Sequence, residues 1–270
     1  MTILPHGVRS NGHETSQLGP NEAPILAVGD SYTFGDQVSD HETWPAVLEE
    51  LVGRPVINGG VFAYGIDQIF LRTTQLLDIY QPDTLIFSFI AHDIFRAQLV
   101  EMMGVGKPYF DVSDDTLTLK NVPVPLPENY MIGPFRNLLS YSYFFHKFMT
   151  LVAPVYWLQG TEPLKGAHLE GAKVGCLLMR ELSLLARERQ LEVYVLVQET
   201  VDPTPGNLHM LDQVLACVDT RMLHLVDVRS VLAAIQQTDP QQYARYFEKT
   251  HMSTEGNAFV ARIIQTAMTD

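Results

Sequence analysis

The stretch Ile25-Leu26-Ala27-Val28-Gly29-Asp30-Ser31-Tyr32-Thr33-Phe34-Gly35 places an apolar run directly before a glycine and two polar residues. The run predicts a buried strand, and the residues after it predict a turn into a helix. Ser31 would then lie at the carboxyl edge of a sheet, where α/β folds place their ligands. Serine and aspartate also cap ordinary helices, so this stretch alone is compatible with a functional site or with a simple cap.

Working outward from this stretch, short apolar runs alternate with longer amphipathic patterns. The alternation predicts an α/β fold with a parallel sheet covered by helices on both faces. The predicted strands are residues 25–28, 55–57, 84–90, 193–197 and 222–228, and the predicted helices are 43–52, 67–80 and 167–189.

The chain has 270 residues, of which 46% are apolar, so it can bury a sizeable core. We expect a single domain over residues 1–270, with an N-terminal extension at 1–22. Residues 95–165 form an insertion after the third strand that is too long for an ordinary connection. It contains a predicted hairpin at 109–119 and an aromatic stretch at 140–158. The insertion is interpreted either as a lid or acyl-binding wall over the site, or as additional core packing.

Charge and composition restrict the partners. The formal net charge is -13 and no cluster of lysine or arginine reverses it locally, so we expect no nucleic-acid partner. His146, Lys147 and Pro154 interrupt the aromatic stretch, which argues against a membrane span. Cys176 and Cys217 lie in predicted helices, and we interpret them as buried thiols rather than a disulfide. The sequence carries no indication of oligomeric state.

The first 21 residues are polar and lack the basic start and apolar run of a secretory signal. The chain as it stands is therefore expected to be cytoplasmic. An exported protein from which a leader had been removed would have the same sequence.

A serine hydroxyl becomes a nucleophile only beside a base, and its reaction needs donors for the oxyanion. The second predicted strand ends in Asn58-Gly59-Gly60 and the third in Ala91-His92-Asp93, so both end at the edge that carries Ser31. The backbone N–H of Gly60 is a candidate oxyanion donor. The alternative is that the two glycines only turn the chain.

A candidate base lies near the C-terminus. His251 precedes a predicted amphipathic helix that Ser253 or Thr254 can cap, and Glu248 lies three residues upstream, from where it could hold the imidazole ring. His251 is also one of nine histidines, and taken alone it fits an ordinary surface residue.

Together these segments resemble the SGNH (GDSL) hydrolase family. Gly29-Asp30-Ser31 matches its first block, Asn58-Gly59-Gly60 its second, and Glu248, His251 and Gly256 its last. The resemblance implies a flavodoxin-like, three-layer α/β/α fold with a doubly wound, five-stranded parallel sheet. It also implies that Ser31 is the nucleophile, His251 the base, Glu248 the acid that orients the base, and Gly60 an oxyanion donor, with no cofactor and no metal.

The chain departs from the family pattern at two positions. The third block is usually Gly-x-Asn-Asp, and here it is Ile90-Ala91-His92-Asp93. His92 either donates to the oxyanion through a ring N–H, or is an ordinary polar residue that leaves the third donor missing. Glu248 stands where the family has Asp, which changes the reach of the carboxylate but not its charge.

The predicted function is a serine esterase or deacylase that hydrolyses an O-acyl ester through an acyl-enzyme. The lead-in Val8-Arg9-Ser10-Asn11-Gly12 resembles a subgroup associated with bacterial surface polysaccharides, which favours a carbohydrate O-acetyl ester among small-molecule substrates. Two alternatives remain open: an O-acyltransferase that uses a sugar acceptor, and a non-catalytic binding module that kept the fold.

Overall fold

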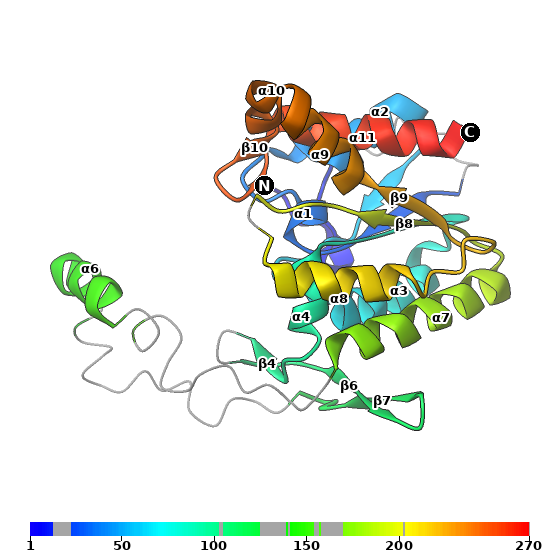
Figure 1. The fold of residues 1–270 in the computed structure, drawn as a ribbon, viewed down its shortest axis with the longest axis horizontal. Coiled ribbons are helices and arrows are strands. Elements are labelled where there is room, and N and C mark those ends of the chain that lie inside the picture. Colours follow the sequence, from blue (N-terminus) through cyan, green and yellow to red (C-terminus); the bar gives the residue numbers. More distant parts are fainter. Residues whose placement is uncertain are drawn as a thin grey trace.

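The fold is built on a parallel sheet, as predicted (Figure 1). The computed structural model describes residues 1–12, 23–102, 105–124, 139, 141–153, 157, 170–201 and 203–269. Five strands form the sheet in the order β2-β1-β3-β8-β9, and every neighbouring pair is parallel. Their bounds are β1 (Ile25–Val28), β2 (Val56–Asn58), β3 (Thr84–Phe89), β8 (Glu192–Val197) and β9 (His224–Asp227). Each lies within two residues of its predicted position at both ends, and the flavodoxin-like α/β/α fold is confirmed.

Helices cover both faces of the sheet. One face packs against α3 (Ile66–Tyr80), α4 (Ala91–Arg96), α7 (Gly171–Arg189) and α8 (Pro205–Leu215). The other carries α2 (Trp44–Val52), α9 (Val228–Thr238), α10 (Pro240–Arg245) and α11 (Thr254–Thr269). The two layers explain the unbroken apolar runs, because a strand covered on both faces needs apolar side chains at every position. In β1, Leu26 and Val28 pack on the α3 and α7 side, and Ile25 and Ala27 on the α2 and α11 side.

The N-terminal residues form part of this body. Arg9 pairs with Asn58 at the end of β2 through an antiparallel bridge, and Val8 joins the core beneath α3. Arg9 and Asn11 are buried. The segment that the sequence suggested as an extension therefore contributes, in residues 1–12, to the packing at the edge of the sheet.

The insertion begins after α4. Its described parts contain two short antiparallel pairs and one helix: β4 (Glu101–Met102) with β5 (Val105–Gly106), β6 (Tyr109–Ser113) with β7 (Thr116–Lys120), and α6 (Tyr143–Val152). The β6–β7 pair confirms the predicted hairpin, with Asp114 and Asp115 at its turn in the left-handed region. Figure 1 shows α6 away from the sheet. Much of the rest of the predicted insertion lies outside the described residues.

The prediction of two buried thiols was wrong. Cys176 on α7 and Cys217 after α8 form a disulfide, with their Cα atoms 5.3 Å apart. Both residues are only partly buried. The packing of α7 against α8 brings together two positions 41 residues apart, which the sequence spacing does not reveal. Of the helices within the described ranges, none is both long and apolar enough to cross a bilayer.

Candidate active site

Ser31 is the first residue of α1 (Ser31–Phe34), which follows β1 after Gly29 and the cap residue Asp30. Asp30 caps this helix, since its carboxylate accepts a hydrogen bond from the N–H of Tyr32 at 2.9 Å. Gly35 ends the helix with φ 83°, a conformation that favours glycine. The helix is therefore a single turn held at both ends, and it presents Ser31 at the carboxyl edge of the sheet.

His251 contacts this serine directly. Its Nε2 lies 2.9 Å from Ser31 Oγ, although the two residues are 220 positions apart. The ring is carried by a hairpin of β10 (Phe247–Glu248) and β11 (His251–Met252). Tyr32 holds the hairpin in place, because its hydroxyl donates to the carbonyl of Thr250 at 2.6 Å and its ring packs on the imidazole with centroids 5.0 Å apart.

The other ring nitrogen faces a carboxylate that the sequence analysis did not single out. Asp36 Oδ2 lies 3.8 Å from His251 Nδ1, and Thr250 Oγ1 lies 3.1 Å from the same nitrogen. Glu248 was expected there, and the structure corrects this expectation. Residues 247–252 form a hairpin in which Glu248 lies opposite His251, but the Glu248 side chain is exposed and makes no ion pair with the ring within the described residues.

The loop that carries Asp36 is held by the buried guanidinium of Arg9. Arg9 donates to the carbonyls of Phe34 at 2.7 Å and Val38 at 2.6 Å, and it also donates to the carbonyl of Gly35. Its Nε donates to the carboxylate of Asp40 at 3.0 Å. Four bonds from one buried side chain fix the course of this loop. Arg9 belongs to the segment Val8-Arg9-Ser10-Asn11-Gly12, whose sequence resembles a polysaccharide-associated subgroup. In the structure this segment supports the loop that follows Ser31.

Gly60 lies against the turn that carries the nucleophile. A Cβ at this position would come within 2.3 Å of the backbone nitrogen of Phe34, so only glycine allows this close approach. Its N–H donates to Asn58 Oδ1 at 3.1 Å. The Gly60 N–H could therefore bind an oxyanion only if the oxyanion replaced Asn58 Oδ1 as the acceptor of this hydrogen bond.

His92 lies in the first turn of α4, and its side chain is partly buried. An amide nitrogen can only donate, so the 3.1 Å contact from Asn207 Nδ2 makes His92 Nδ1 an acceptor. Burial, and secondarily the positive charge of Arg96, lowers the pKa of His92. The neutral ring therefore carries its proton on Nε2, which leaves one N–H available as a donor.

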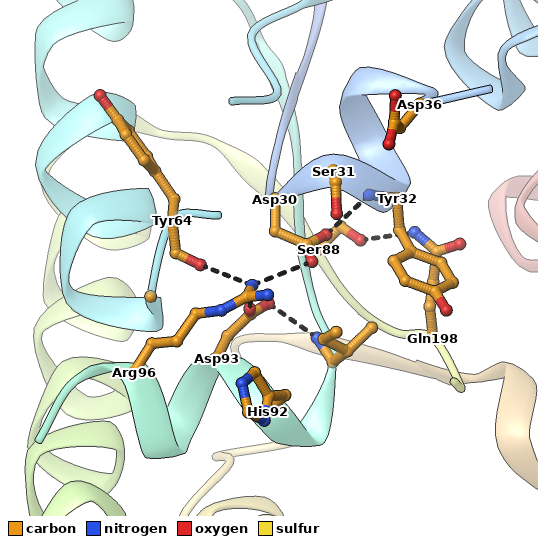
Figure 2. A network of polar contacts seen from close by, with 12 residues as sticks. Asp30, Ser31, Tyr32, Asp36, Tyr64, Ser88, His92, Asp93, Arg96 and Gln198 are labelled. Atoms are coloured by element: carbon orange, nitrogen blue, oxygen red, sulfur yellow. Dashed lines mark hydrogen bonds and ion pairs between the residues drawn. The ribbon is translucent and has the colours of Figure 1, made fainter. Parts of the chain in front are cut away.

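A buried ionic network lies beneath Ser31 (Figure 2). Arg96 Nη1 pairs with Asp93 Oδ1 at 2.5 Å and with Asp30 Oδ2 at 3.5 Å, and it donates to the carbonyl of Tyr64 at 3.2 Å. Both carboxylates are completely buried. Burial raises the pKa of Asp30, and it raises that of Asp93 further because the two acids also repel each other. Figure 2 shows Asp36 on the opposite side of α1 from Arg96.

Ser31 and His251 open into a cleft of about 480 Å³. Its walls come from the start of α1, the start of α4, the loop that enters α8, and the β10–β11 turn. The lining residues are Ser31, Tyr32, Ile90, Ala91, His92, Arg96, Thr200, Val201, Pro203, Thr204, Asn207, Lys249, Thr250 and His251. Of the predicted insertion, Arg96 at the end of α4 lines the cleft, but none of the described residues between 97 and 165 does, so the lid interpretation receives no support from that part of the chain.

Sequence reasoning missed Asp36, Asn207 and Thr250. Asp36 immediately follows the first block, and its acidic side chain one residue after Gly35 was the only available signal. Nothing in the sequence indicates that Asn207 meets His92, because they are 115 positions apart. Over the described part of the chain, no group of three or more His, Cys, Asp or Glu side chains is arranged to hold a metal ion.

Comparison with known proteins supports the fold. No family model matches the sequence, and no curated protein matches it. The structure resembles a member of the lipolytic protein G-D-S-L family from Veillonella parvula DSM 2008, with a TM-score of 0.51, 12% identity, and coverage of 91% of this chain and 98% of that one. It also resembles LAE5, an α/β hydrolase enzyme from the metagenome of Lake Arreo, Spain, with a TM-score of 0.52, 12% identity, and coverage of 92% and 95%. The chain thus has the fold of the GDSL lipolytic proteins.

Proposed function

We propose that the protein is a serine hydrolase that cleaves O-acyl esters through an acyl-enzyme on Ser31. The observation that carries the proposal is the 2.9 Å contact between Ser31 Oγ and His251 Nε2 at the wall of the cleft. A serine that only capped a helix would need no imidazole at its hydroxyl. A nucleophile needs this base, because the hydroxyl is a weak nucleophile until its proton is removed.

In the proposed acylation step, Ser31 Oγ attacks the ester carbonyl while its proton moves to His251 Nε2. The bond from the carbonyl carbon to the alcohol oxygen then breaks, and His251 returns the proton to the departing alcohol. In deacylation a water molecule attacks the acyl-enzyme and gives a proton to His251. The bond from the carbonyl carbon to Ser31 Oγ then breaks, the acid leaves, and Ser31 Oγ recovers its proton from the imidazolium.

The developing oxyanion needs preorganised donors. We assign this role to the backbone N–H of Ser31, which as part of the first helical turn has no partner within the helix, to the N–H of Gly60, and to Nε2–H of His92. The acceptor state of His92 Nδ1 supports the third assignment. An imidazole N–H at this place would supply what an asparagine amide supplies in the family that the sequence resembles.

For the substrate we propose an ester of a polar alcohol, with a carbohydrate O-acetyl group as the main candidate. The support comes from the cleft walls, where the side chains of Thr200, Thr204, Asn207 and Lys249 offer hydrogen-bonding partners for hydroxyl groups. The resemblance of the lead-in segment adds to this support, although its Arg9 is buried behind the site.

The test compares hydrolysis of p-nitrophenyl acetate and p-nitrophenyl octanoate by the wild type and by Ser31→Ala. We expect a loss on the order of 10⁴-fold or more in Ser31→Ala, because removal of a triad nucleophile has effects of this size. Ser183→Ala is the matched control, since its hydroxyl donates to the Met179 carbonyl of its own helix and the residue is not part of the cleft lining. A preference for acetyl over octanoyl would support the short-acyl substrate.

Two other outcomes would contradict the proposal. Equal background rates in the wild type and Ser31→Ala on all esters would favour a non-catalytic binding module. Turnover that begins only after a sugar acceptor is added, with the acyl group recovered on that sugar, would favour an O-acyltransferase.

A further inference from the structure

The geometry points to Asp36, and not Glu248, as the residue that positions His251 and balances its charge during the reaction. This inference rests on the proposed function, because it assigns the third member of the Ser31–His251 system. It differs from the arrangement expected from the sequence, in which the carboxylate lies three residues before the histidine on the same loop.

Asp36 is built into the turn that carries the nucleophile. Its backbone N–H donates to the carbonyl of Ser31 at 3.1 Å. Its Oδ1 accepts from the N–H of Gln37 at 3.1 Å, and its Oδ2 faces His251 Nδ1 at 3.8 Å. One carboxylate oxygen is thus tied to the backbone, and the other is directed toward the base.

The loop around Asp36 is fixed from behind. Arg9 binds the carbonyls of Phe34, Gly35 and Val38, and so holds the chain on both sides of Asp36. The Arg9 side chain is 1% exposed, so these bonds are shielded from water. A carboxylate on a loop held in this way keeps a constant position relative to Ser31, which a positioning residue requires.

The other charged groups near the ring are less suited to this role. Asp30 also acts electrostatically on His251, but its carboxylate is engaged by the Tyr32 N–H and Arg96. Glu248 is exposed, and Lys249, which follows it in the turn, has the wrong sign. The Tyr32 hydroxyl donates its hydrogen bond to the Thr250 carbonyl. Among these charged groups, Asp36 is the one whose carboxylate faces Nδ1 of His251.

The proposed proton transfer explains why a carboxylate next to His251 Nδ1 would matter. In the resting state Nε2 accepts the Ser31 proton, so neutral His251 carries its own proton on Nδ1, within reach of Thr250 Oγ1 at 3.1 Å. When Nε2 takes up the serine proton, the ring becomes a cation. The negative charge of Asp36 favours that cation, and no proton passes to the carboxylate.

The experiment compares Asp36→Asn with Glu248→Gln, each measured for kcat and KM against pH in the full chain. Asp36→Asn keeps an oxygen for the Gln37 N–H and removes only the charge. We expect kcat/KM to fall on the order of 10²-fold, less than for a buried triad aspartate, because the Asp36 side chain is 38% exposed. Glu248→Gln should change kcat/KM by less than about 2-fold.

The pH profile separates positioning of the base from a structural role. Loss of the Asp36 charge makes the imidazolium less favourable, so the midpoint of the acidic limb of kcat/KM should move to lower pH in Asp36→Asn. Asp36→Glu, which restores the charge, should recover part of the rate and return the midpoint toward that of the wild type. A rate loss without a shift, an unchanged enzyme, or loss and shift together in Glu248→Gln would each overturn the inference.

An NMR titration of the His251 ring gives a readout that does not depend on turnover. The midpoint should again be lower in Asp36→Asn than in the wild type, and unchanged in Glu248→Gln. If the wild type hydrolyses no ester but this shift is present, the proposed function fails and the Asp36–His251 pairing stands. If esters are hydrolysed and the midpoint is the same in all three proteins, the pairing fails and the proposed function stands.

Discussion

Two groups of charged residues lie on opposite sides of α1 and differ in burial. On one side Asp30 and Asp93 are completely buried and share the guanidinium of Arg96. On the other side the partly exposed Asp36 faces the ring of His251. The buried group fixes the start of α1 and α4, and its two carboxylates are engaged by one guanidinium. Asp36 faces His251, which changes charge during the proposed reaction. Carboxylates therefore stabilise the fold on one side of α1 and support the proposed catalysis on the other.

The largest effect is expected from Arg96→Met, which removes the cation from the buried group. Breaking a buried ion pair leaves an uncompensated charge and costs about 3–5 kcal/mol of unfolding free energy. Urea denaturation should show this loss. The exposed pair of Arg245 with Glu255 offers the control, since Arg245→Met should change stability by less than about 1 kcal/mol. Equal effects of the two substitutions would contradict the stabilising role assigned to the buried ion pairs of Arg96.

The same variant has a predictable pH dependence. Burial already raises the pKa values of Asp30 and Asp93 above those of the unfolded chain, and loss of Arg96 raises them further. The folded state then binds more protons than the unfolded state, so stability falls as pH rises through these carboxyl pKa values. Arg96→Met should therefore lose more stability relative to the wild type at pH of about 8 than at about 5. A constant difference would contradict the assigned ion pairs.

His92→Ala should affect activity more than stability. If His92 Nε2–H is an oxyanion donor, its loss should lower kcat on the order of 10²- to 10³-fold. His92→Asn, which supplies an amide donor, should retain more activity than His92→Ala. His209→Ala, on the exposed face of α8, is the control and should leave the rate unchanged. Equal activity of His92→Ala and the wild type would exclude His92 as a donor.

Much of this arrangement follows from the sequence. The strands were predictable because burial on both faces requires unbroken apolar runs, as in Ile25–Val28. Ser31 and His92 were expected at one edge because parallel strands end on the same side. The contact of His251 with Ser31 was expected from the motif resemblance, since no local pattern links residues 220 positions apart.

Other features depend on geometry that the sequence does not encode locally. The hairpin at residues 247–252 leaves Glu248 in solvent, and the bonds of Arg9 direct the loop that brings Asp36 to the imidazole. The disulfide of Cys176 with Cys217 depends on how α7 packs against the end of α8. These features are set by tertiary packing, so they could be found only in the folded chain.

The smallest effect is expected from Tyr32→Phe, which removes the bond that holds the His251 hairpin. Burial raises the pKa of Tyr32, so its hydroxyl stays protonated and donates to Thr250. Loss of one such bond costs about 1 kcal/mol, and we expect a several-fold fall in kcat/KM. Tyr194→Phe loses a comparable bond to Glu192, which lies outside the cleft lining, and should keep full activity. A wild-type rate in Tyr32→Phe would show that the hairpin needs no such tether.

The most direct test of the central claim is covalent labelling by a fluorophosphonate, followed by mass spectrometry of the peptide that contains Ser31. A fluorophosphonate reacts with a serine activated by a base and leaves a phosphonyl group on its oxygen. We predict one adduct on Ser31 in the wild type, strongly reduced labelling in His251→Ala, and none in Ser31→Ala. Absence of labelling in the folded wild type, or equal labelling in wild type and His251→Ala, would contradict the assignment of Ser31 as a nucleophile activated by His251.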